Sequence, residues 1–140
     1  MKSKYVDNIY STSIKTDIKG FIDAEKIQKL KSDKNVELNN KKIEKKDKEK
    51  TSKELKKNIN KNKQDLDKIK NDLKTLSTSD PDYKILKGAK RELENKINSD
   101  EDEIKVLQKE IGSLDSKIGG LETNIRNISS AIKTLTLGAY

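Results

Sequence analysis

Isoleucine recurs at every seventh position through most of the C-terminal half of this chain, and leucine dominates the alternating positions. The isoleucines are Ile97, Ile104, Ile111, Ile118, Ile125 and Ile132, and the alternating positions hold Leu86, Leu93, Asp100, Leu107, Leu114, Leu121, Ile128 and Leu135. Steps of three and four residues place these side chains on one stripe of an α-helix, and this isoleucine–leucine pattern favours two-stranded coiled coils. We therefore predict a long helix over residues 81–135 whose stripe is buried against other helices.

The composition argues against a compact globular core and favours packing of this helix against other helices. Charged residues make up 40% of the chain and hydrophobic residues only 30%, with one Phe and no Trp. A compact core needs apolar side chains from several directions, whereas a helical pair needs only two positions in seven. The expected fold is all-α: an elongated antiparallel helical hairpin or coiled coil, which we expect to be oligomeric.

The clearest local break lies at residues 77–80, which are small and polar. Asp80 belongs to the residue types preferred as helix N-caps, and Pro81 suits the first position of a helix because its missing N–H has no partner there anyway. We predict a turn at 77–80 that joins a first long helix over residues 23–76 to the second helix over 81–135.

Folding the chain back at this turn brings matching positions of the two predicted helices together. Leu76 then lies opposite Leu86, and the polar residue Asn62 falls opposite the polar residue Asp100. Lone polar residues in a helical seam can set its register. We predict an antiparallel hairpin in which Asn62 and Asp100 form a register layer.

The match fails beyond Leu107, because Leu114 would face Lys48 and Leu121 would face Lys41. Lysine stems cover some apolar surface, but we expect this part of the stripe to be poorly covered and to need another helix. That helix would come from a second copy of the chain or from another helical protein. The predicted partner-binding seam is Ile104, Leu107, Ile111, Leu114, Ile118, Leu121, Ile125, Ile128, Ile132 and Leu135.

Residues 41–57 hold nine lysines against four acidic residues. Such a face could bind nucleic-acid phosphates or an anionic membrane surface. A solvated helix face with interspersed ion pairs is the favoured interpretation, because arginine and aromatic residues are missing from the stretch. The candidate anion-binding residues are Lys41, Lys42, Lys45, Lys46, Lys48, Lys50, Lys53, Lys56 and Lys57.

Catalysis has little support in this sequence, which contains no Cys and no His. Thiolate nucleophiles, a histidine base and the usual zinc sites are excluded. The acidic run from Asp100 to Glu103 points around a helix axis and favours a solvated turn over a cation site. We expect no enzyme, no catalytic residue, no cofactor and no metal.

Residues 1–22 form an apolar leader that we expect to be separate from the helices and loosely ordered, and residues 136–140 a short tail. No uninterrupted apolar run reaches the length of a transmembrane helix, and no apolar segment of a secretory signal follows the first residues. We expect a cytoplasmic protein, or one exported without a cleavable signal peptide.

The segment around the end of this leader runs Ile18-Lys19-Gly20-Phe21-Ile22-Asp23-Ala24-Glu25-Lys26-Ile27-Gln28-Lys29-Leu30. This segment resembles the start of flagellar filament-capping (hook-associated) proteins. An apolar leader before long terminal helices also looks like the axial proteins of flagella and secretion systems. The resemblance implies terminal helices packed in a tubular assembly and export without a cleaved signal.

These observations favour a non-enzymatic coiled-coil protein for structure or assembly that acts through helix–helix association, in a bacterial filament or secretion apparatus. A nucleic-acid-associated protein using the face at residues 41–57 is the alternative. A secreted effector or chaperone is a third reading, suggested by the apolar leader.

Overall fold

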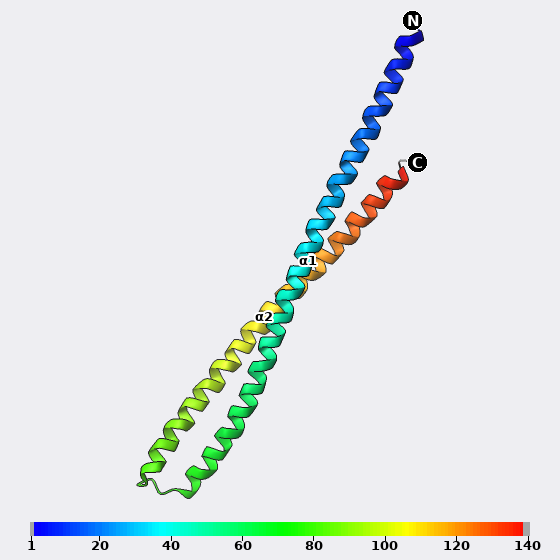
Figure 1. The fold of residues 1–140 in the computed structure, drawn as a ribbon. Coiled ribbons are helices and arrows are strands. Elements are labelled where there is room, and N and C mark those ends of the chain that lie inside the picture. The colour runs from blue at the N-terminus through cyan, green and yellow to red at the C-terminus, as the bar shows by residue number, and fades with distance from the viewer. Residues whose placement is uncertain (1, 139–140) are drawn as a thin grey trace. The chain divides into compact units, whose positions relative to one another are not determined.

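The computed structural model describes the backbone of residues 2–138 and the side chains of residues 23–134. Two helices account for nearly all of it: α1 spans Lys2–Thr75 and α2 spans Pro81–Gly138 (Figure 1). No strand occurs between residues 2 and 138. The predicted all-α helical hairpin is therefore confirmed.

The ends of both helices lie further out than the sequence indicated. α1 begins at Lys2 rather than at residue 23 and passes through Gly20 without a break, and no glycine of the described backbone has a positive φ. One glycine costs a helix only about 1 kcal/mol relative to alanine, which flanking helix formers can offset. α2 likewise continues past residue 135 to Gly138. The side chains of the predicted leader, 1–22, lie outside the described residues, as does the side chain of Leu135.

The turn between the helices is held by the hydrogen bonds expected of an N-cap. The Asp82 backbone N–H donates to Asp80 Oδ1 at 2.9 Å, and the Tyr83 N–H donates to the Asp80 carbonyl at 3.0 Å. The Asp80 N–H in turn donates to the Ser77 carbonyl at 3.0 Å. Because the cap satisfies donors that would otherwise be orphaned, α2 starts at Pro81.

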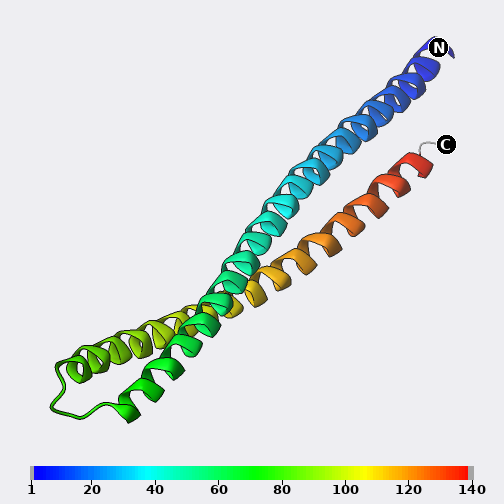
Figure 2. The same cartoon turned by 60° about the horizontal axis from the view of Figure 1, so that its bottom comes forward.

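The chain divides into two compact units, and residues 43–115 form the one that contains the turn, here called the turn unit. In it α1 and α2 run antiparallel on either side of the turn (Figures 1 and 2). Its core joins Ile59 and Leu66 of α1 to Ile97 and Ile104 of α2. Leu55 and Leu93 pack against this cluster.

Ion pairs between the helices show the register of the turn unit. Lys63 lies 3.3 Å from Glu101, Lys48 lies 2.6 Å from Glu110, and Lys45 pairs with Asp115. In each pair the acid lies within four residues of the position predicted to face the lysine, before that position for Lys48 and Lys45 and after it for Lys63. A shift by a whole heptad would separate all three pairs by about 10 Å.

The second unit, called the terminal unit, consists of residues 1–42 and 116–140. Leu38 of α1 and Leu121 of α2 are buried in it, and Lys42 pairs with Glu122 at 3.9 Å. Ile132 shares an open depression with α1 residues from Gln28 to Asn39. The two helices are therefore antiparallel in this unit as well.

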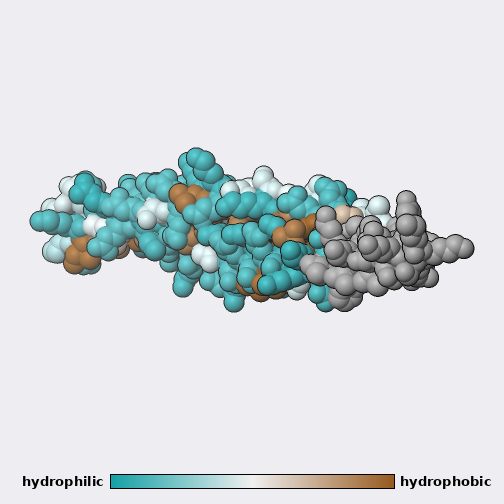
Figure 3. Space-filling view, turned by 90° about the horizontal axis from the view of Figure 1, so that it is seen from above, coloured by the Kyte–Doolittle hydropathy of each residue, from teal (hydrophilic) through white to brown (hydrophobic). Residues whose placement is uncertain are grey.

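Hydrophilic side chains dominate the face seen in Figure 3, where apolar residues occur as small separate patches. The exposed large apolar residues among those described are Leu30, Val36, Ile43, Ile85 and Val106. Within the described residues, neither helix has a stretch apolar and long enough to cross a bilayer.

Candidate helix-association site

The predicted partner-binding seam of α2 divides into two rows that differ in burial. Its leucine row, Leu107, Leu114 and Leu121, is buried. The isoleucine row is only half-buried, and it consists of Ile111, Ile118, Ile125 and Ile132, with Ile128 half-buried beside it. Ile104, at the start of the seam, is buried in the core of the turn unit.

The reason for this difference lies in α1. Its half-buried and buried positions follow the same steps of three and four residues that define the α2 seam, but lysines fill many of them. In the terminal unit these positions are Lys31, Lys34, Leu38 and Lys41, and in the turn unit they begin with Lys45, Lys48 and Ser52. The α2 seam is therefore covered largely by lysine stems where apolar side chains would normally pack.

Each seam lysine of the turn unit sends its ammonium group sideways to an acid that flanks the α2 seam. Lys48 Nζ donates to Glu110 Oε2 at 2.6 Å, and Lys45 pairs with Asp115 and, at 3.7 Å, with Glu49. The methylene stems can then lie over apolar side chains while the charges stay near water. The hydrogen bond to Glu110 raises the pKa of Lys48, and that to Asp115 raises the pKa of Lys45.

The burial of Leu114 and Leu121 differs from the expectation drawn from the sequence. Leu114 and Leu121 were expected to be poorly covered opposite lysines, yet Leu114 is only 4% exposed and Leu121 only 7%. The positions of α1 that face Leu114 and Leu121 in the predicted register are lysines, so we infer that lysine stems cover these leucines. The isoleucine row remains only half-buried.

The predicted register layer contains a buried carboxylate. Asp100 is 1% exposed, and in the sequence of α2 it lies between Ile97 and Ile104, which belong to the core cluster with Ile59 and Leu66. Lys96 Nζ donates to Asp100 Oδ1 at 3.1 Å, whereas Oδ2 has no partner among the described residues. Asn62 of α1 is half-buried at this level, but no hydrogen bond within residues 23–134 joins it to Asp100.

The nine lysines of residues 41–57 do not form one face. Lys41, Lys45 and Lys48 occupy the α1 seam, and Lys42 pairs with Glu122. The other five are exposed: Lys46, Lys50, Lys53, Lys56 and Lys57. Lys31 and Lys34, which the sequence interpretation did not single out, also lie on the seam. Counting steps of three and four residues back from Leu38 would have identified them.

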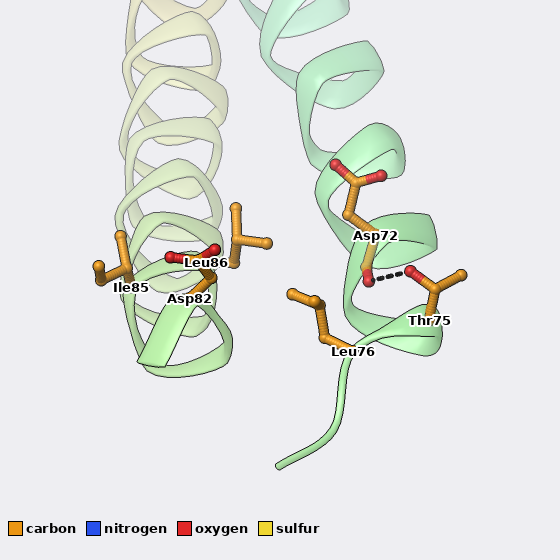
Figure 4. Close-up of a pocket in the computed structure, with 6 residues that line it drawn as sticks. All are labelled: Asp72, Thr75, Leu76, Asp82, Ile85 and Leu86. Carbon is orange, nitrogen blue, oxygen red and sulfur yellow. Dashed lines mark hydrogen bonds between the residues drawn. The ribbon is translucent and has the colours of Figure 1, made fainter. Parts of the chain in front are cut away.

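A shallow depression of about 370 Å³ lies beside the turn, lined by residues from both helices (Figure 4). Leu76 and Leu86 project between the helices, while the carboxylates of Asp72 and Asp82 come from opposite sides and do not converge. Thr75 Oγ1 donates to the carbonyl of Asp72 at 2.8 Å, which closes the last turn of α1. Within residues 23–134 no three metal-ligating side chains gather at one point.

Replacing Asp100 with Leu is expected to stabilise the hairpin by about 1–3 kcal/mol, because it removes a buried carboxylate with an unpaired oxygen. Urea unfolding followed by circular dichroism measures the change. Asp102→Leu, at an exposed position two residues away, should change stability by no more than about 0.5 kcal/mol. A loss of stability in Asp100→Leu would show that the carboxylate is well accommodated and contradict this account.

The raised pKa values of Lys45 and Lys48 predict a loss of stability at high pH. Their ion pairs contribute fully below the ordinary lysine pKa of 10.5 and are lost as pH rises through the raised values of the folded state. The unfolding free energy of the wild type should therefore fall relative to that of Lys45→Met/Lys48→Met above about pH 10.5. The exposed pair Lys53→Met/Lys57→Met controls for net charge, and an identical pH profile for both double variants would contradict the prediction.

Comparison of the chain with protein-family models, curated proteins and solved structures finds no match. The resemblance of residues 18–30 to filament-capping proteins stays a prediction. What the two helices do is therefore inferred from their geometry and their charge.

Proposed function

We propose that this protein is a non-enzymatic assembly protein that acts by helix–helix association, with the isoleucine row of α2 as its docking surface. The observation that carries the proposal is the incomplete cover of that row by α1. Ile111, Ile118, Ile125 and Ile132 remain half-buried although they repeat with a heptad spacing typical of buried seams. A further helix laid along the row would complete their burial.

The exposed part of the row provides a driving force for association. Complete burial of an isoleucine side chain contributes roughly 1.5–3 kcal/mol, and each of these half-buried side chains has already gained most of it. Four of them leave roughly 2–4 kcal/mol to be gained on each subunit. An isologous dimer buries the row of both subunits, so the total gain is comparable with the lower estimates of the cost of association, about 4 kcal/mol.

A second copy of the chain is the partner we favour. Two identical isoleucine rows offer each other apolar side chains that repeat with the same heptad spacing, so they can match along their length. A homodimer also needs only one surface, because an isologous contact uses the same patch on both subunits. Another helical protein with an apolar stripe is the alternative occupant.

We further propose the kind of assembly in which this association takes place. The resemblance of residues 18–30 to filament-capping proteins supports a place in a bacterial filament or secretion apparatus, with export without a cleavable signal peptide. The absence of Cys and His from the sequence supports a non-enzymatic role, since thiolate nucleophiles and histidine, the most frequent general base, are missing.

Sedimentation equilibrium of the full chain over a wide concentration range tests self-association. Ile118→Gln/Ile125→Gln is expected to weaken the dimer at least about tenfold, because two amides would replace apolar contacts at the interface. Val106→Gln changes an exposed branched residue of α2 away from the row and should leave the dimer unchanged.

Circular dichroism shows whether the variants keep their helicity. A wild-type chain that stays monomeric at every concentration would rule out self-association. Equal weakening by Val106→Gln would show that the isoleucine row is not the contact surface.

A further inference from the structure

Five exposed lysines follow one another along the surface of α1 in the turn unit: Lys46, Lys50, Lys53, Lys57 and Lys61. Their steps of four, three, four and four residues confine them to roughly 80° of arc at 3.6 residues per turn. The row is about 22 Å long at ~1.5 Å per residue. We call these residues the lysine row.

The charge of the lysine row is not neutralised within the described structure. None of the five side chains takes part in an ion pair or hydrogen bond with any residue of 23–134. Asp47 and Glu54 lie along one border of the row, but no salt bridge joins them to it. The row therefore presents a continuous line of positive charge to solvent.

The lysine row lies on the side of α1 that faces away from the seam. Lys57 and the core residue Ile59 are two positions apart, which separates their directions by about 160° around the helix axis. The α2 acids that flank the seam, Glu110 and Asp115, pair with the seam lysines Lys48 and Lys45, and Glu49 of α1 lies 3.7 Å from Lys45. The row therefore faces solvent rather than α2.

We propose that the lysine row binds the phosphate backbone of nucleic acid, without preference for base sequence. A straight line of ammonium groups matches a linear polyanion, and lysine contacts phosphate as a point charge. No aromatic residue lies between residues 41 and 61, so stacking on bases is not available to give sequence preference. This binding surface is separate from the isoleucine row and does not depend on the proposed self-association.

The composition of the row favours nucleic acid over a membrane surface. Helices that bind in the plane of a bilayer combine basic residues with an apolar face that enters the lipid. On the side of α1 that carries the lysine row, the only exposed large apolar residue among those described is Ile43, one turn before Lys46. A single apolar side chain provides little surface to insert into a lipid bilayer.

Fluorescence anisotropy of a labelled 30-base-pair duplex of mixed sequence, titrated with the full chain at several salt concentrations, tests the proposal. The expected dissociation constant of the wild type at low salt lies in the micromolar range, and the logarithm of affinity should fall with the logarithm of salt at a slope near −4. Lys46→Gln/Lys50→Gln/Lys53→Gln/Lys57→Gln should weaken binding at least tenfold and flatten the slope by about three units.

A matched variant removes the same charge from α2: Lys105→Gln/Lys109→Gln/Lys117→Gln/Lys133→Gln, all at exposed positions. It should weaken binding less than about threefold, since it leaves the row intact.

Equal losses in the two variants would attribute binding to net charge and overturn the proposal. So would the absence of binding at low salt, or binding only to vesicles that contain phosphatidylserine. Helicity and sedimentation of both variants separate these outcomes from a failure to fold or to self-associate.

Discussion

The apolar seam of α2 is covered by lysine stems, and the other features of the hairpin depend on where the charges of those lysines go. A lysine can lie over Leu114 only if its ammonium group reaches water or a carboxylate. Glu110 and Asp115 flank the seam at that level and bind Lys48 and Lys45. The acids therefore allow lysine side chains to lie over an apolar seam, and their ion pairs agree with the register of the apolar core.

This arrangement sorts the lysines of α1 into two groups with different consequences. Seam lysines, such as Lys48, lie opposite the α2 seam and pair with the flanking acids Glu110 and Asp115. Outer lysines, such as Lys50, form no ion pair within the described residues. The proposed docking of a second helix and the proposed binding of nucleic acid use different sets of residues.

The all-α fold and the hairpin could be predicted because isoleucine and leucine mark α2 so regularly and because Asp80 and Pro81 mark the turn. The register layer of Asn62 and Asp100 stays a prediction, since no hydrogen bond within residues 23–134 joins the two side chains. The covered state of Leu114 was not, because a hydropathy pattern counts lysine as polar and ignores its four methylene groups. The early start of α1 at Lys2 was missed because an apolar, irregular leader and Gly20 suggested a break that helix propensity does not require.

Disulfide formation across the seam tests the central claim, that lysine stems of α1 face the leucines of α2, most directly. The natural chain has no cysteine, so Lys48→Cys/Leu114→Cys introduces the only thiols. Mild oxidation should close an intramolecular bond, because the register places the two positions opposite each other and a disulfide needs Cβ atoms about 3.5–4.5 Å apart. Leu55→Cys/Leu114→Cys, one heptad out of register, should stay reduced. Rapid closure of the shifted pair with none in the first would show that α1 does not lie on α2 in this register.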